Sequence, residues 1–487
     1  MTTLNIGNRR ELFVDDVLLE NMTNTQLKLH EPVSGGMAIK IDKSWEGPAN
    51  FGMSIIQDGD RLLMYYRGWS DRVNDQNGVG CVAVSEDGEH WEKPALNLVQ
   101  RDGWTDNNII ATDTGAPEFA FPCAPWVDTR PGVPANEHIK MFKCVPLSGE
   151  VHSAMRDPGG AKRLVFYASA DGFTFRKLDP QPEFVTDLPN AFDGGNTMFW
   201  SEAEQQYVVY FRCMDKPGDR LFRTMARATS RDLLTWSEPE LMTYGDTARE
   251  QFYVNNTQPY FRAPHIYIAP AARFMESRAV VTPEQAEAIG LVTPGDPEKA
   301  RLYTQANACS DGVLLTSRPG STRYDRTFME TFVRPGVGYQ NWTARSNYPL
   351  TGIFPCGPDK MMMFVTRCYM QPTWHIERLL LRTDGFASVS APHAGGEMVT
   401  RPFTFAGKEL ELNYRTGAPG FVRVELQDEA GKPMEGYTVD DCPEIIGDEI
   451  KRTVAWKNGT DISALAGKPV RLRFVMKDAD LFSVKFG

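Results

Sequence analysis

Carboxylate and amide side chains recur just before strand-like segments rich in aromatic residues. Asp193 lies in AFDGGNTMFW, Glu250 precedes QFYVNNTQPY, and Asp311 lies in CSDGVLLTS. Glycoside hydrolysis needs two carboxyl groups across the scissile bond, one to protonate the leaving oxygen and the other to act as base or nucleophile. Amides suit sugar hydroxyls because both donate and accept hydrogen bonds. These residues predict glycosidic bond cleavage if the fold brings them to one cavity.

The three carboxylates form the predicted catalytic set. Asp193 is flanked by glycines, which let a ligand approach the backbone closely, although Asp-Gly-Gly is also a turn sequence. Glu250 is interpreted as the general acid, with a surface charge before a strand as the alternative, and Asp193 would tune or position it. Asp311 or Glu46 would supply the base, and a hairpin turn is the competing reading of Asp311.

Further polar residues are predicted to contact substrate. They are Glu46, Asn50, Arg67, Asn196, Asn255, Glu330, Arg345, Asn347 and His375. Glu46 has the alternative of opening a turn, and Glu330 that of an ion pair with Arg326 or Arg334. Arg67, Arg345 and also Arg212 suit a substrate carboxylate or sulfate, or else neutralise the acids. His375, beside Trp374, is alternatively a core histidine.

A repeated unit of about 74 residues must position these side chains. In each unit a polar approach segment precedes an aromatic-rich strand, and a further strand follows and leads into a turn. The aromatic-rich strands are DRLLMYYRGW, HIKMFKCVP, QQYVVYFRC, HIYIAPAARF and DKMMMFVTR. Turns are expected at Asp87-Gly88, Asp171-Gly172, Arg231-Asp232, Pro319-Gly320 and Asp384-Gly385. One short helix is predicted after Thr282, with Pro283 in its first turn.

Five such units predict an all-β fold, a five-bladed β-propeller followed by a small β-sandwich. We expect the propeller to span residues 1–395, with the segments RELFVDDVLLE and TQLKLHEP closing the ring against the last blade. A β-sandwich is the alternative for so many strands. From residue 396 to 487 strictly alternating runs such as FVRVELQ and RLRFVMK predict the separate sandwich. The first strand of each blade would line the central channel, where the polar residues converge.

Composition limits the classes of partner. With 41% hydrophobic and 24% charged residues the chain reads as globular, and its net charge of −11 disfavours nucleic acid and anionic membranes. Its eight cysteines show no zinc spacing and suit a reducing compartment. We therefore expect a cytoplasmic protein with no cofactor. A structural calcium ion in the channel is retained as an alternative. A homo-oligomer is compatible with the sequence.

Several segments carry a family resemblance. RRELFVDDVLLE, WEGP, TDNNII, FDGGNTMFW and the C-terminal stretch from GDEIKRTVAW to DLFSVKFG resemble uncharacterised bacterial proteins grouped with the five-bladed propeller glycoside hydrolases. That group contains invertases, fructosidases and arabinanases. The resemblance implies a first-blade Asp as nucleophile or base, a middle Asp and a Glu acid. Asp193 and Glu250 match the last two roles, whereas the first blade offers Glu46 and Asn50 where the invertase-like enzymes have Asn-Asp-Pro-Asn.

The sequence therefore predicts a glycoside hydrolase acting at a chain end on an oligosaccharide or glycoside. Two alternatives are retained. One is a propeller that binds carbohydrate without catalysis, in which the acids are isolated and ion-paired. The other is a sialidase-like hydrolase of an acidic sugar, which needs three inward arginines and a tyrosine nucleophile.

Overall fold

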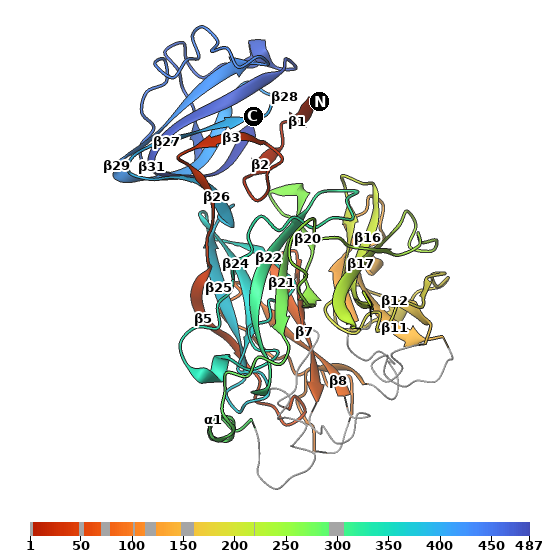
Figure 1. The fold of residues 1–487 in the computed structure, drawn as a ribbon. Helices are drawn as coiled ribbons and strands as arrows, with labels where there is room; N and C mark the ends of the chain where they lie inside the picture. The colour runs from red at the N-terminus through yellow and green to blue at the C-terminus, as the bar shows by residue number, and fades with distance from the viewer. Residues whose placement is uncertain are drawn as a thin grey trace. The chain divides into compact units, whose positions relative to one another are not determined.

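Antiparallel four-stranded sheets recur along the chain (Figure 1). The computed structural model describes residues 3–47, 53–69, 78–100, 103–112, 123–147, 160–218, 220–291 and 306–487. Two compact units form within it. The larger unit comprises Pro32–Cys356 and Met362–Leu380, and the smaller comprises Met1–Glu31, Gly357–Met361 and Leu381–Gly487.

The larger unit is a five-bladed β-propeller. Blade 1 consists of β6 (Ser54–Asp58), β7 (Arg61–Trp69), β8 (Gly78–Ser85) and β9 (Ile109–Thr112). Blade 2 consists of β10 (Cys123–Val127), β11 (Ile139–Pro146), β12 (Lys162–Ser169), β13 (Arg176–Lys177) and β14 (Val185–Thr186). Blade 3 consists of β15 (Thr197–Ser201), β16 (Gln206–Asp215), β17 (Phe222–Ser230) and β18 (Glu240–Leu241). The five aromatic-rich segments predicted as second strands are β7, β11, β16, β21 and β24.

The last two blades depart from simple sequence order. Blade 4 consists of β19 (Phe252–Asn255), β20 (Gln258–Tyr260), β21 (Ala263–Met275) and β22 (Cys309–Ser317), with β19 and β20 on one edge of β21. Blade 5 consists of β23 (Phe354–Cys356), β24 (Lys360–Arg367), β25 (His375–Arg382) and β5 (Val33–Lys40). The N-terminal β5 therefore closes the ring by pairing with β25.

A serine and an aspartate shape the hairpin turns of blades 1 to 3. In blade 1 the Ser85 hydroxyl accepts hydrogen bonds from the backbone N–H groups of Asp87 and Gly88, while the Asp87 carboxylate accepts from those of Glu89 and His90. The same bonds recur around Asp171 and Asp232. These local bonds explain why the turns were visible in the sequence.

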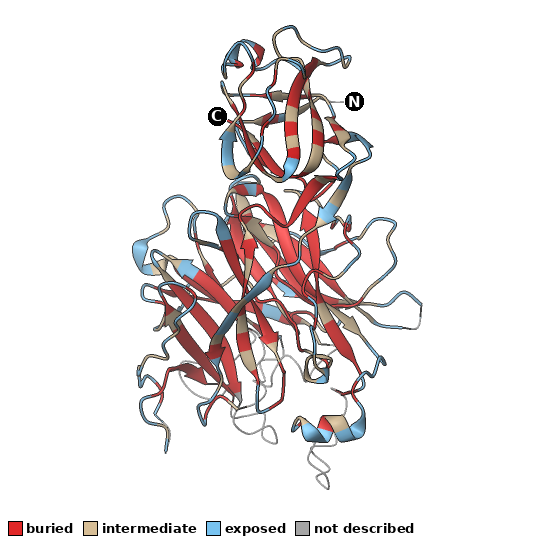
Figure 2. Ribbon diagram, turned by 90° about the vertical axis from the view of Figure 1, so that its left-hand side faces the viewer, coloured by how far each residue is buried: buried red, intermediate tan, exposed pale blue. Residues whose placement is uncertain are grey.

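Hydrophobic side chains of neighbouring sheets fill the space between the blades. Figure 2 shows the buried residues concentrated along the strands and the exposed ones on the loops. Helix α1 (Pro283–Ala288) lies in a blade 4 loop and begins with the expected cap, in which the Thr282 hydroxyl accepts from the Gln285 backbone N–H. The prediction of this helix is confirmed.

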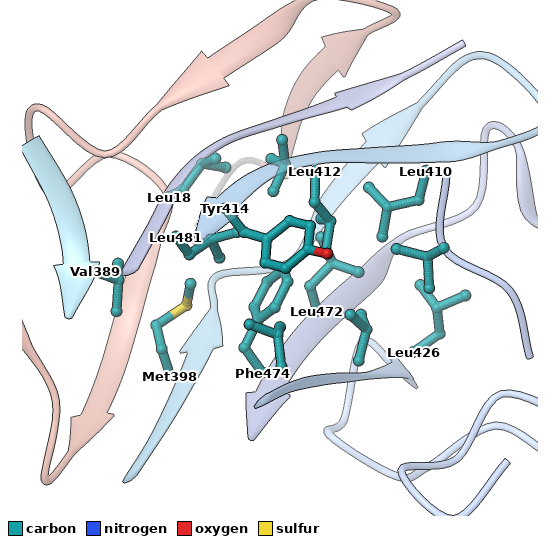
Figure 3. Close-up of a cluster of buried hydrophobic side chains, with 14 of the residues drawn as sticks. Leu18, Val389, Met398, Leu410, Leu412, Tyr414, Leu426, Leu472, Phe474 and Leu481 are labelled. Atoms are coloured by element: carbon teal, nitrogen blue, oxygen red, sulfur yellow. The ribbon is translucent and has the colours of Figure 1, made fainter. Parts of the chain in front are cut away.

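The smaller unit is one hydrogen-bonded network of ten strands. They are β1 (Leu4–Gly7), β2 (Arg10–Leu12), β3 (Leu19–Thr23), β4 (Gln26–Leu29), β26 (Ala387–Ala391), β27 (Gly396–Thr400), β28 (Phe403–Phe405), β29 (Leu410–Asp428), β30 (Asp448–Thr453) and β31 (Val470–Phe486). A buried cluster that includes Met398, Leu412, Tyr414 and Phe474 forms its core (Figure 3). The description of this unit as a two-sheet sandwich stays a prediction.

The N-terminal strands correct one expectation. The segments RELFVDDVLLE and TQLKLHEP were predicted to close the propeller, but β2 pairs with β31, β3 with β27 and β4 with β26, all inside the smaller unit. The smaller unit thus includes residues on both sides of the boundary drawn at residue 396. The turn at Asp384-Gly385 accordingly lies in the smaller unit, and the fourth strand of blade 5 comes from β5.

Candidate functional site

Four blades carry an arginine near the end of the second strand. Arg67 and Arg212 each follow by two positions a residue that pairs with the first strand, Arg273 pairs with Phe252 at the start of β19, and Arg367 follows by two positions Val365, which bridges Pro349 ahead of β23. Because the two strands are antiparallel, all four arginines lie where the first strands begin. We call this the arginine end of the propeller.

A cavity of about 810 Å³ opens at the arginine end on blade 4. Its wall contains Glu250, Arg273 and Asp311 together with the aromatic residues Phe274 and Trp342. The volume falls within the range of roughly 300–1,000 Å³ usual for small-molecule sites. Two of the three predicted catalytic carboxylates therefore share one cavity.

The side chain of Arg273 joins these two carboxylates. Its Nε and Nη2 atoms donate to Asp311 at 2.9 and 2.6 Å, and Nη1 donates to Glu250 at 2.9 Å. Arg326 donates to the other Glu250 oxygen at 2.5 Å, and the Thr331 hydroxyl donates to Asp311 at 2.5 Å. Burial opposes the charge of Arg273, but the hydrogen bonds to Asp311 and Glu250 raise its pKa above the ordinary value. Both carboxylate side chains keep 15% of their surface exposed.

Asp193 lies at the arginine end of blade 3, where it forms an ion pair with Arg212. The two glycines that follow Asp193 allow neighbouring parts of the chain to pack closely against its backbone. A Cβ atom on Gly194 would lie 2.8 Å from Arg212 Cδ, and one on Gly195 would lie 2.9 Å from Val254 Cβ. The DGG sequence thus serves the approach of Arg212 and β19, and Gly195 also lines a small cavity of about 30 Å³ together with Arg345.

Three guanidinium groups surround the ring of Tyr253. The Cζ atoms of Arg212, Arg223 and Arg345 lie 4.8, 5.1 and 5.2 Å from the ring centroid. Arg345 Nη2 also donates to the Tyr253 hydroxyl at 2.8 Å. Cation–π contacts of this kind stabilise both partners. Of the arginines singled out from the sequence, Arg212 and Arg345 are brought together here, whereas Tyr253 and Arg223 were missed.

Glu46 is a structural residue of blade 1. Its side chain has 0% exposed surface. Its oxygens accept hydrogen bonds from Lys93 at 2.8 Å, from the Tyr66 hydroxyl at 2.6 Å and from the backbone N–H groups of Asp42 and Lys43. Arg67, on the neighbouring β7, is 2% exposed. The prediction that Glu46 contacts substrate or acts as base does not fit a carboxylate enclosed on every side.

The predicted amides bind the protein backbone. Asn196 donates to the carbonyls of Phe192 and Gly194, and Asn347 donates to those of Ser310 and Asn341. The Asn255 oxygen accepts from the Thr257 backbone N–H and from the Thr257 hydroxyl. The Asn347 oxygen accepts from the Arg367 side chain at 2.5 Å. All three amides are buried, so in this arrangement they hold the strand ends.

The other predicted contacts are dispersed. Glu330 is exposed on the loop beside Thr331, and His375 lies on the third strand of blade 5, where its Nδ1 atom bonds to the Thr373 carbonyl. Asn50 lies outside the described residues. Neither Glu330 nor His375 lines the blade 4 cavity.

The first strands do not make the polar channel that was expected. A second cavity of about 320 Å³ is lined by residues from all five blades, and its wall is mostly apolar. The lining includes Ile56, Trp126, Met198, Trp200 and Phe354. The polar residues singled out from the sequence mostly precede the first strands and therefore lie at the arginine end.

Metal and membrane features are absent from the described residues. No group of three or more His, Cys, Asp or Glu side chains there is placed to hold a metal ion. In the same part of the chain, no helix is both long and apolar enough to cross a membrane.

Known proteins resemble this chain in their three-dimensional structures, and no match was found by sequence. No protein-family model matches the sequence, and no curated protein matches it. A solved structure described as a glycoside hydrolase is 11% identical, with a TM-score of 0.46 over 72% of this chain and 92% of that chain. A putative glycoside hydrolase from Parabacteroides distasonis is 13% identical, with a TM-score of 0.40 over 74% and 97%. A glycosyl hydrolase from Bacteroides ovatus is 13% identical, with a TM-score of 0.39 over 77% and 93%.

Proposed function

We propose that the protein is a carbohydrate-active enzyme that hydrolyses a glycosidic bond in the blade 4 cavity. One observation carries the proposal. Glu250 and Asp311 bind different edges of the Arg273 guanidinium in the wall of a single cavity. Two carboxylates in one substrate-sized cavity are the minimum that glycoside hydrolysis requires.

We assign the two carboxylates the two roles that glycoside hydrolysis requires. Glu250 is the general acid, which enters the reaction protonated and gives its proton to the leaving oxygen. Asp311 is the base or nucleophile at the anomeric carbon. Asp193, away from the cavity wall, positions Arg212 beside Tyr253.

The rest of the cavity wall suits a sugar. The aromatic residues Phe222, Phe274 and Trp342 line the wall as apolar surface against which a pyranose can pack, and Gln251 and Ser310 offer polar groups for hydroxyls. Ligand sites commonly combine an apolar wall with a few directed polar groups. This composition supports a saccharide over a purely apolar ligand.

The test is turnover of a panel of aryl glycosides and plant or algal oligosaccharides by the full-length protein. Glu250→Gln and Asp311→Asn should each lower product formation about a thousandfold while circular dichroism stays unchanged. Glu240→Gln, at an exposed position on β18, is the matched control and should keep full activity. Full activity in both cavity variants would exclude this site.

A second candidate function is carbohydrate binding without catalysis. The ion pairing of Glu250, Asp311 and Asp193 favours it, because paired acids hold a structure as readily as they react. A saccharide that binds the wild type without being cleaved, and binds Glu250→Gln equally well, would support binding over hydrolysis.

The arginines around Tyr253 favour a third candidate, the sialidase-like reaction on an acidic sugar. That reaction needs a tyrosine nucleophile, and Tyr253 is the tyrosine on which three guanidinium groups converge. The variant Tyr253→Phe tests whether Tyr253 is the nucleophile. A nucleophile would lose all turnover, whereas a residue that only supports Arg345 would leave measurable activity.

A further inference from the structure

The blade 4 cavity carries an excess of positive charge in a strongly acidic chain. Its wall contains five arginines, Arg220, Arg249, Arg273, Arg278 and Arg334, against three acids, Glu250, Glu276 and Asp311. The whole chain has a net charge of −11. A local field opposite in sign to the net charge attracts ligands of negative charge to that site.

Two arginines at the cavity lack a carboxylate partner among the residues that the structure describes. Arg278 is exposed in the cavity wall, and no ion pair involves it there. Arg223 is half-buried beneath the wall, where its Nη1 atom donates to the neutral Gln251 side chain at 2.7 Å. Burial lowers the pKa of Arg223 below its ordinary value. Arg278 is therefore the cation in the wall that a ligand's anion can reach, whereas Arg223 lies outside the cavity lining.

Aromatic and cationic groups alternate along the same wall. The Phe222 ring has the guanidinium groups of Arg220 and Arg249 at 5.0 and 4.9 Å from its centroid. Phe274 lies 4.8 Å from the Arg223 guanidinium. Guanidinium groups therefore already lie over the Phe222 and Phe274 rings, and Arg220 and Arg249 are ion-paired with Glu276 and Asp215. A neutral saccharide would leave Arg278 without a counterpart.

We infer that the cavity binds a saccharide that carries a carboxylate or sulfate group, with Arg278 as its anion partner. The saccharide part of this inference rests on the proposed function. The anionic part rests on the charge of the wall. Planar carboxylate and tetrahedral sulfate both accept paired hydrogen bonds from guanidinium groups.

The experiment measures binding to the full-length protein by isothermal titration calorimetry at low ionic strength. Four probes are used: hexagalacturonate, its carboxyl-reduced neutral counterpart, a sulfated dextran oligosaccharide and unsulfated dextran of equal length. At least one anionic probe should bind about tenfold more tightly than its neutral counterpart, because charge-assisted hydrogen bonds are stronger than neutral ones. The stronger anionic probe identifies the preferred group.

Variants locate the effect. Arg278→Gln should weaken binding of the preferred anionic probe about tenfold and reduce its salt dependence. Arg231→Gln, an exposed arginine at the hairpin turn of blade 3, should bind as the wild type does. The absence of any preference for anionic probes, or unchanged affinity in Arg278→Gln, would overturn the inference.

The outcome separates this inference from the proposed hydrolysis. If an anionic probe binds with the expected preference and is never cleaved, the inference of anion binding stands and the proposal that the protein hydrolyses that saccharide is wrong. If neutral glycosides are cleaved and no anionic preference exists, the inference is wrong and hydrolysis stands.

Discussion

The first and fourth blades each place a glutamate ahead of their first strand, with opposite consequences. Glu46 in blade 1 is fully enclosed, and Lys93, Tyr66 and backbone N–H groups bind its oxygens. Glu250 in blade 4 is bound by two arginines but remains partly exposed in a large cavity. The comparison teaches that the type of residue and its place in the repeat do not determine its role. What separates the two is whether a ligand can reach the ion pair.

The largest expected difference concerns turnover. Glu250→Gln and Asp311→Asn should lower kcat by about 10³, the scale of losing an acid or base, because the amide cannot transfer the proton. Glu46→Gln should leave kcat of the folded protein unchanged. Steady-state kinetics on the best substrate of the panel measures both effects. A comparable loss of kcat in Glu46→Gln would remove the contrast between the blades.

Stability should show the opposite order. Glu46→Gln removes the buried member of the two carboxylates that bind the Lys93 ammonium and leaves only the half-exposed Asp42, which costs roughly 3 kcal/mol of unfolding free energy. Glu250→Gln should cost less, about 2 kcal/mol, since Arg273 keeps its bonds to Asp311 and the amide oxygen can still accept a hydrogen bond from Arg326. Urea unfolding followed by tryptophan fluorescence measures the two values. Replacing Lys93 by Met in the Glu46→Gln background should recover part of the loss, which a simple packing defect would not allow.

Alanine substitutions at one tightly packed glycine in blade 1 and one in blade 4 compare the effect of a backbone shift in the two blades. A Cβ atom on Gly68 of blade 1 would lie 2.7 Å from the Trp45 carbonyl oxygen, and one on Gly312 of blade 4 would lie 2.8 Å from Val333 Cβ. Each alanine substitution should cost about 2 kcal/mol through overpacking. Gly312→Ala should also raise KM, because Gly312 follows Asp311, whereas Gly68→Ala should not. Equal KM values in the two variants would contradict the placement of the site on blade 4.

The smaller unit supplies a pH-dependent reference that involves neither blade. Burial lowers the pKa of His30 from 6.5 to about 4, with Arg415, Lys28 and Arg382 adding to the effect and Asp480 opposing it. The unfolded chain therefore binds a proton more readily than the folded one. Stability of this unit should fall as the pH drops from about 6.5 toward 4 and stay level above 6.5. Thermal denaturation across this range should show a shallower slope in His30→Gln, and an unchanged slope would reject His30 as the cause.

Local features of the fold could be predicted and long-range pairings could not. The Ser-x-Asp turns and the second strands β7 and β16 follow from bonds and alternation within a few residues. The partners of β2 and β4 depend on β31 and β26, far along the chain. Strand alternation shows that a segment is extended but carries no information about the sheet it joins.

The candidate site was predictable to the same degree. Glu250 and Asp311 were singled out and do share a cavity, but the cation that joins them, Arg273, was overlooked although it stands in the quoted strand HIYIAPAARF. The available signal was the arginine near the end of the second strand in four of the units. Glu46 could not be distinguished from Glu250, because its enclosure depends on Lys93 and Tyr66, which the repeat does not specify.

Ring closure through β5 sets the order in which the propeller can be completed during synthesis. Val33–Lys40 is synthesised hundreds of residues before its partner, His375–Arg382. Long-range pairings of this kind form slowly, and unpaired edges attract other chains. The exposed Val33 and Met37 make this strand apolar on its surface. Until β25 emerges, the nascent chain therefore carries an open edge, which a chaperone or an early-folding neighbour would have to shield.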